Sequence, residues 1–299
     1  MKTIKILTII SLFIFLMPTN GFSEVELSPY FNAGSFTGSI TDAQAKVVDA
    51  LTASGFEIIG EYQPGNNKNL KVVVYTSAEI KSTCLKVKDR GALAAALKVG
   101  FIAKANVVKI SYVNPEYLFN AYFMDEYTTH KTMLAGIAEN IKSTLNLFGT
   151  NPKAFGGAVE LDDLREYQYM FGMEEFTDPV ELKEFSSFDE GLKTISKNLA
   201  AQKGGTVKVY KLVFKEEKIA VFGIALTDKE DGEAFFLPTI GEAHVAAMPY
   251  EIILQGKEAT MLHGRYRIAL HWPELTMGTF TKIMSTPGYI EDTMEALCE

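Results

Sequence analysis

The chain has 299 residues, of which 47% are hydrophobic and 22% charged, an ordinary balance for a globular protein of about two domains. Its formal charge of −8 predicts an acidic surface that repels phosphate backbones, so nucleic acid is not an expected partner. Two cysteines, Cys84 and Cys298, are too few for a disulfide framework or a cysteine metal cluster. Whether these two thiols pair with each other is left open by the sequence.

The N-terminus has the organisation of a secretory signal peptide. Lys2 and Lys5 precede an apolar run at 6–17 that is too short to span a bilayer, and small polar residues follow it. We expect cleavage near Ser23, which leaves 276 of the 299 residues and changes the formal charge from −8 to −10 because both lysines are lost. No later stretch is apolar enough for a transmembrane segment in the mature chain. We therefore expect a periplasmic or secreted protein.

The residues that follow predict a first α+β repeat at 24–150. Ser39 or Thr41 is the candidate cap of the first helix, and Gly55 ends that helix. Helices are expected at 39–54, 78–97 and 115–147, and strands at 56–62, 70–76, 99–103 and 107–113.

A connecting segment is expected at 151–186, with some helix packed between the two repeats. The second repeat is expected at 187–299, with Ser187 as the cap of its first helix. Its helices are expected at 187–202, 240–248, after Pro273 and after Pro287, and its strands at 206–214, 219–227, 250–255 and 259–270. Strands joined by short turns predict that each repeat is an antiparallel sheet with helices on one face.

A motif that occurs twice indicates that the two repeats are related. Residues 110–122 read ISYVNPEYLFNAY and residues 268–280 read IALHWPELTMGTF, with the Ile, the Pro-Glu pair and the closing aromatic residue in the same register. We interpret each copy as the junction between a strand and a helix, with proline in the first helical turn.

These segments resemble the bacterial domain of unknown function number three hundred and two. The resemblance rests on Gly55-Phe56, on the strand that ends at Asn114-Pro115, on residues 248–253 (MPYEII) and on residues 266–273. The chain departs from the family pattern at Lys98, where the family has proline, and at Trp272, where it often has asparagine. The resemblance implies two divergent tandem copies of a compact domain whose shape is similar to the TATA-box-binding-protein-like fold. It implies no activity.

The two strand-to-helix junctions are the candidate ligand site, because free helix N–H groups and polar side chains meet there. If pseudo-twofold symmetry brings both junctions to one cleft, six residues line it. They are Tyr112, Asn114 and Glu116 from the first repeat and His271, Trp272 and Glu274 from the second. A glutamate near a helix N-terminus also complements the helix dipole, so a purely structural role for both glutamates is the alternative.

The first functional hypothesis is a non-catalytic exported protein that binds a small molecule or an envelope protein between the repeats. One rival is a hydrolase-like enzyme that uses His271 with Glu274 or Glu116. The other is a haem or metal carrier that uses His244 and Met248, four residues apart on a predicted helix. The chain has no P-loop, no Gly-x-Ser-x-Gly motif and no Cys-x-x-Cys-His motif. The sequence identifies no cofactor.

Overall fold

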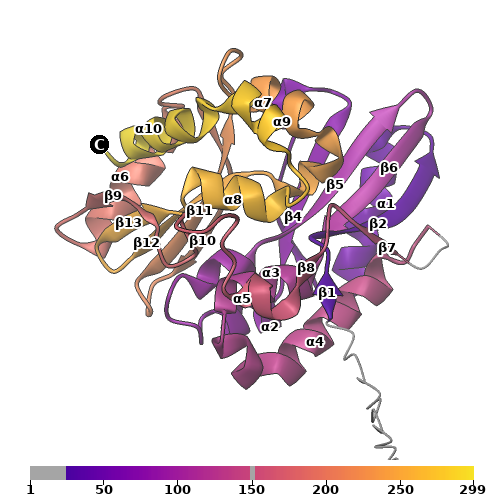
Figure 1. The fold of residues 1–299 in the computed structure, drawn as a ribbon, viewed down its shortest axis with the longest axis horizontal. Coiled ribbons are helices and arrows are strands. Elements are labelled where there is room, and N and C mark those ends of the chain that lie inside the picture. The colour runs from indigo at the N-terminus through magenta and orange to yellow at the C-terminus, as the bar shows by residue number, and fades with distance from the viewer. Residues whose placement is uncertain (1–24, 149–151) are drawn as a thin grey trace, which may run out of the picture.

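The computed structural model describes residues 25–148 and 152–299, and the expected signal peptide lies outside these ranges. Two antiparallel sheets form the architecture, which confirms the predicted α+β class (Figure 1). The first sheet has the order β3 (Glu57–Tyr62), β4 (Leu70–Thr76), β5 (Leu97–Lys104), β6 (Val107–Val113), β2 (Tyr30–Thr37) and β7 (Lys153–Phe155). The second has the order β10 (Thr206–Phe214), β11 (Ile219–Leu226), β12 (Tyr250–Gln255), β13 (Glu258–Met261) and β9 (Val180–Glu184). A third, short sheet pairs β1 (Glu26–Leu27) with β8 (Val159–Glu160).

The helices are distributed over both halves. The first half holds α1 (Ile40–Ala53), α2 (Ala78–Cys84), α3 (Pro115–Phe123), α4 (Glu126–Leu145) and the 3-10 turns η1 (Pro64–Asn66) and η2 (Gly91–Ala95), and α5 (Leu161–Arg165) follows. The second half holds α6 (Phe188–Ala200), α7 (Glu233–Ile240), η3 (Glu242–Ala247), α8 (Gly264–His271), α9 (Met277–Phe280), η4 (Thr281–Ile283) and α10 (Thr286–Cys298). Among the described residues, no helix is both long and apolar enough to cross a membrane.

Serine caps begin the first helix of each half, as the sequence predicts. Ser39 accepts a hydrogen bond from the backbone N–H of Asp42, and Ser187 accepts one from that of Glu190. Helix α1 packs on β3, β4 and β5, while α6 packs on β10, β12 and β13. Both helices therefore pack on the first and third strands of these orders, β3 and β5 for α1 and β10 and β12 for α6.

The two sheets match in strand order and also in register. Five consecutive strands of the first sheet (β3-β4-β5-β6-β2) correspond to the five strands of the second (β10-β11-β12-β13-β9). Both sheets have a one-residue bulge in the first hairpin, at Ile59 in β3 and at Val209 in β10. Both have another in the last pair, at Ala33 in β2 and at Leu182 in β9. Two sheets that shared only their strand order would have no reason to carry bulges at the same positions.

The register of the two sheets shows that the two copies of the sequence motif do not occupy equivalent positions. Asn114 caps α3 by accepting from the N–H of Glu116, and its counterpart is His263, whose Nδ1 accepts from the N–H of Arg265 and caps α8. His271 is the last residue of α8 and Trp272 is its C-cap. The prediction that Asn114-Pro115-Glu116 and His271-Trp272-Pro273-Glu274 occupy equivalent junctions is therefore wrong.

The error has a physical cause in the second half. Residues 259–270 read as one strand, whereas β13 ends at Met261 and α8 begins at Gly264. Most of α8 is buried, including Tyr266, Ile268 and Leu270. Tyr266, Ile268 and Leu270 are two residues apart in the sequence GRYRIALH, which is the period of a strand rather than the 3.6-residue period of a helix.

Two other boundaries also differ from the expected ones. Strand β9 lies inside the expected connecting segment but pairs with β13, so the second sheet begins before residue 187. The expected helix at 240–248 is divided between the end of α7 and the 3-10 turn η3.

The halves are joined by reciprocal packing. Turn η3 lies on β4, β5 and β6 of the first sheet, and η2 lies on β11 and β12 of the second. Gly100 in β5 permits this contact, because a Cβ there would lie 2.6 Å from Val245 Cγ1. The edge strands β3 and β10 also meet, and a Cβ on Gly60 would lie 2.4 Å from the carbonyl oxygen of Val209.

A buried ion pair crosses this interface. Lys98 lies opposite Val74 in the first sheet, and Glu251 lies opposite Gly223 at the same register position of the second. Lys98 Nζ is 2.6 Å from Glu251 Oε1, and Arg267 Nη2 is 3.1 Å from Glu251 Oε2. Arg267 also donates to the carbonyls of Ala247 and Pro249. All three charged side chains are at most 7% exposed. The interaction of each cation with the carboxylate therefore replaces the water that these groups lose on burial.

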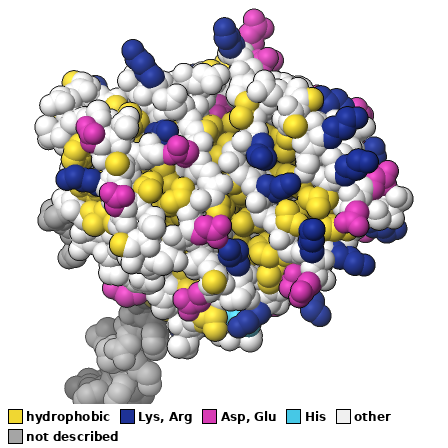
Figure 2. Space-filling view, turned by 180° about the vertical axis from the view of Figure 1, so that it is seen from behind, with side chains coloured by type: hydrophobic (Ala, Val, Ile, Leu, Met, Phe, Trp, Pro, Cys, Tyr) yellow, Lys and Arg dark blue, Asp and Glu magenta, His cyan; other side chains and the backbone are white. Residues whose placement is uncertain are grey.

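The outer surface is mixed in charge. In the view of Figure 2, lysine and arginine side chains gather toward one side, acidic side chains are interspersed, and hydrophobic side chains form separate groups. This face therefore carries charges of both signs.

We expect Glu251→Gln to lower the free energy of unfolding by about 3–5 kcal/mol, because Lys98 and Arg267 both lose their buried carboxylate. Lys98→Met should lower it by less, since Arg267 still pairs with Glu251. Urea unfolding followed by circular dichroism measures both, with Glu216→Gln on an exposed turn as the control. Equal effects of the two interface substitutions would contradict this account.

Candidate functional site

The three first-half residues of the predicted site line a small cavity. Tyr112, Asn114 and Glu116 surround a volume of about 80 Å³ beside α4. Both ends of the Asn114 side chain already form structural hydrogen bonds. Its NH₂ group donates to the carbonyl of Ser28, and its oxygen caps α3. Burial raises the pKa of Tyr112, so its phenol stays protonated at neutral pH.

The three second-half residues lie elsewhere. Trp272 and Glu274 line a cavity of about 410 Å³, whereas His271 is buried behind it. This cavity shares no lining residue with the one at Asn114. The described structure therefore does not bring the six predicted residues into one cleft, and ligand binding by either set stays a prediction.

His244 also lines the larger of these two cavities, and the six predicted site residues did not include it. Its ring centroid lies 4.9 Å from that of Tyr30, 5.5 Å from that of Trp272 and 5.7 Å from that of Phe155. Tyr30 and Phe155 belong to the first sheet, so the ring sits where the two halves meet. Its position on a 3-10 turn gives no periodic signal that sequence reasoning could use.

Hydrogen bonds define the state of His244. Nδ1 lies 3.0 Å from the carbonyl oxygen of His271, which only accepts, so Nδ1 carries a proton. Nε2 lies 3.7 Å from Glu274 Oε1. Burial lowers the pKa of His244, although the His271 carbonyl and Glu274 oppose the shift. In the neutral ring, Nε2 is an acceptor at the edge of the cavity.

His271 is held in a second contact. The Tyr30 hydroxyl lies 3.1 Å from His271 Nδ1 and also donates to the His271 carbonyl. Burial lowers the pKa of His271 well below its usual range, and Arg267, Lys98 and His244 lower it further. The neutral, buried His271 therefore links Tyr30 to His244, because the His271 carbonyl accepts from both.

The alternative chemistries find less support in this geometry. Glu274 lies beside His244 rather than His271, and Glu116 lines the other cavity. His244 is on a 3-10 turn of about three residues per turn, so it does not share a face with Met248 four residues later. Within the described ranges, no group of three His, Cys, Asp or Glu side chains could hold a metal ion.

The cysteines are unpaired and both are buried. Burial raises the pKa of Cys84, and it raises the pKa of Cys298 to about 12. Both thiols are therefore protonated and weakly reactive at neutral pH.

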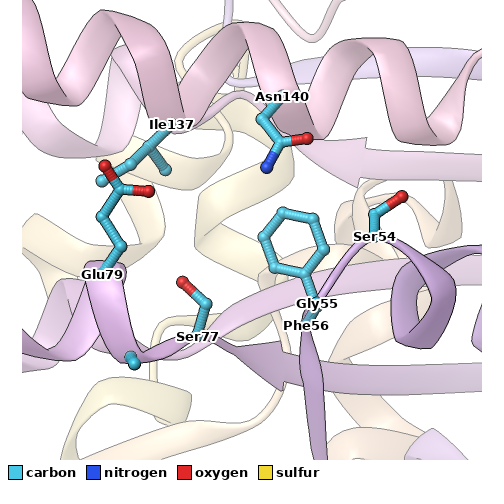
Figure 3. A pocket seen from close by; sticks show the side chains of 8 residues that line it. Ser54, Gly55, Phe56, Ser77, Glu79, Ile137 and Asn140 are labelled. Carbon is cyan, nitrogen blue, oxygen red and sulfur yellow. The ribbon is translucent and has the colours of Figure 1, made fainter.

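Another cavity, of about 180 Å³, lies within the first half between α1, α2 and α4 (Figure 3). Ser54, Ser77, Glu79 and Asn140 surround the ring of Phe56. The Ser77 hydroxyl already caps α2 by accepting from the N–H of Ile80. Because this cavity is small and its Ser77 side chain already has a structural role, it is a weaker candidate for a ligand site than the cavity beside His244.

Comparison with known proteins gives a limited result. No family model matches the chain, and no curated protein matches it. A solved structure of an uncharacterized conserved protein, DUF302 from Bacillus stearothermophilus, is similar to part of it, with 12% identity and a TM-score of 0.34. The match covers 39% of this chain and 95% of that one.

The two imidazoles predict a pH-dependent stability. Their folded-state pKa values are lowered, so the unfolded chain binds more protons below its ordinary histidine pKa of about 6.5. The stability they contribute is complete above that pH and decreases as the pH falls toward 5. Burial raises the pKa of Glu233 to about 7, which acts in the opposite direction over this range, so the histidine contribution is measured by difference. Thermal unfolding at pH 7.5 and 5.0 should show a larger loss in the unchanged protein than in His271→Gln. Proton NMR that finds His271 titrating at or above 6.5 would contradict the assignment.

Proposed function

We propose that this chain is an exported, non-catalytic binding protein that holds a small organic ligand in the cavity beside His244. The observation that carries the proposal is a cavity of about 410 Å³ at which Trp272, His244 and Glu274 converge. This volume falls within the usual range for small-molecule sites, roughly 300–1,000 Å³, and such sites combine apolar walls with a few polar groups. Trp272 and Glu274 come from the predicted site, and His244 completes it.

The polar groups define the chemistry of the ligand. His244 Nε2 is an acceptor when neutral, and the Glu274 carboxylate is 63% exposed and negatively charged. The indole N–H of Trp272 already donates to the carbonyl of Gly241, so the ring contributes apolar contact. A ligand with an apolar body and a hydrogen-bond donor or positive group fits these surroundings. An envelope protein that inserts such a side chain is the alternative partner.

We further propose that the chain is a divergent tandem copy of the DUF302 family, delivered to the periplasm or beyond. The shared strand order and the coinciding bulges support the duplication. The basic, apolar and small-residue segments before Glu24 support export.

Native mass spectrometry of the protein purified from the periplasm tests the ligand site. We expect a co-purified small molecule that is lost in Ala243→Phe, because Ala243 is exposed and lines the cavity, so a larger ring there fills the space. Trp272 is the only tryptophan, so its fluorescence should also change when the ligand is removed and restored.

The matched control is Ala201→Phe, the same change at an exposed position at the end of α6. It should retain the ligand. Equal retention by Ala243→Phe would remove this cavity from consideration, and a co-purified protein in place of a small molecule would favour the partner-binding alternative.

Export is tested by N-terminal sequencing of the protein made in a bacterial host. We expect the periplasmic fraction to contain a chain that begins at Glu24. Recovery of a chain that begins at Met1 in the cytoplasm would contradict export.

A further inference from the structure

Glu233 is a buried acid without a basic partner. It is the first residue of α7, and its side chain is fully buried. Among the described residues, its hydrogen-bond partners are two backbone N–H groups and one phenol, and none of them is a cation. Glu251, by contrast, pairs with both Lys98 and Arg267. The cost of burying a charge on Glu233 is therefore offset by hydrogen bonds without an ion pair.

Two of these three hydrogen bonds cross between the halves. The Tyr62 hydroxyl donates to Oε1 at 3.0 Å and the Gly65 N–H donates to Oε2 at 2.9 Å, and both residues belong to the first half. The third donor is the N–H of Leu226 in the second half, 3.3 Å from Oε1. A Cβ on Gly65 would lie 2.9 Å from the backbone N and Cα of Ala234, so η1 lies directly against the first turn of α7.

The other end of α7 forms part of the cavity beside His244. Residues 238–241 line that cavity. The indole N–H of Trp272 donates to the carbonyl of Gly241, which is the C-cap of α7. Because α7 has only eight residues, a displacement of its first turn also displaces this end. Glu233 is thus linked through one short helix to the cavity wall.

Two opposing effects act on the Glu233 carboxyl. Burial raises its pKa to about 7, although the three donors and Arg267 oppose the shift. If η1 and α7 separated, water would hydrate the carboxylate, and its pKa would return toward the ordinary value of 4.5. The stability that the packed arrangement gains from Glu233 is therefore complete below about pH 4.5 and is lost as the pH rises through about 7.

Other ionisable groups surround Glu233. Burial raises the pKa values of Tyr62, Tyr250 and Tyr289, so these phenols stay protonated at neutral pH. Burial lowers the pKa of His244, so that ring is neutral above the ordinary histidine pKa of about 6.5. The charged side chains on the elements around α7 and on the loop before it are Arg267, Glu251, Glu242, Lys282, Asp228, Lys229, Glu230 and Asp231. Replacing Glu233 alone separates its titration from all of these groups.

We propose that Glu233 is a pH-sensitive latch between the halves: η1 and α7 stay packed while its carboxyl is neutral and separate more often as it ionises, which displaces the α7 wall of the cavity beside His244. An ionised carboxylate that has no cation beside it gains hydration when the contact opens. The latch depends on the interface and not on the proposed ligand, so the two proposals fail separately.

Hydrogen exchange followed by NMR tests the latch on the mature protein, with each rate corrected for the intrinsic exchange rate at its pH. The amides of Gly65 and Leu226 donate to Glu233. Both should lose protection by about ten-fold between pH 6 and 8, because the packed and open arrangements differ in the pKa of Glu233. The indole N–H of Trp272, which donates to Gly241, should lose protection in parallel.

Three variants separate Glu233 from its surroundings. Glu233→Gln removes the titrating group, so its protection should not change between pH 6 and 8 beyond the effects of other groups on the whole molecule. Glu230→Gln is the same change on an exposed side chain three residues earlier and should behave like the unchanged protein. Tyr62→Phe removes one donor from the ionised carboxylate, so the loss of protection should extend to higher pH. It keeps the latch testable if Glu233→Gln does not fold.

Several results would overturn the latch. One is equal protection of Gly65 and Leu226 at pH 6 and 8, and another is an equal loss in Glu233→Gln and in the unchanged protein. A Glu233 carboxyl that titrates near 4.5 by carbon NMR would also contradict it. Unchanged protection of the Trp272 indole N–H would show that the movement does not reach the cavity wall.

Discussion

The contact on which the rest of the molecule depends is the buried ion pair between Lys98 and Glu251. These residues occupy the same register position in the two sheets, yet one is basic and the other acidic. Burial penalises each charge, and the penalty is offset only when the partner half is in place. Arg267 adds a second donor to Glu251 and places its guanidinium 3.8 Å from the ring centroid of Tyr250. The pair therefore fixes how the halves meet and, with them, the cavity beside His244 at their boundary.

Much of the fold could be predicted because its signals are local. Ser39 and Ser187 cap helices as expected, and the hairpin at 206–226 follows from a β-branched run, a charged turn and a second run. The misassigned segment, α8, is buried on most of its surface, and that burial depends on contacts with the rest of the chain. Strand β9 was missed for a related reason, because its five residues, VELKE, are mostly charged and become a strand by pairing with β13.

The candidate site was predictable only in part. Trp272 and Glu274 were found because a proline and an acidic residue mark a chain junction, although that junction is the end of a helix rather than its start. His244 gave no such signal for this site, and the sequence singled it out only with Met248, as a candidate haem or metal ligand. It lies on a 3-10 turn and acquires its surroundings from Tyr30 and Phe155, which are far away in the sequence. Spacing along the chain carries no information about such contacts.

The meeting of β3 and β10 at Gly60 has a consequence for the behaviour of the chain at high concentration. An edge strand exposes backbone groups that recruit other chains, and here the first-hairpin edges of both sheets pack against each other. In the first sheet, β7 covers the opposite edge, next to β2. The corresponding edge of the second sheet is β9, which carries Glu181, Lys183 and Glu184 and is bent by the bulge at Leu182. Charge and irregular backbone oppose the addition of another strand there, so one edge of the second sheet is covered by the first sheet and the other is protected by its own sequence.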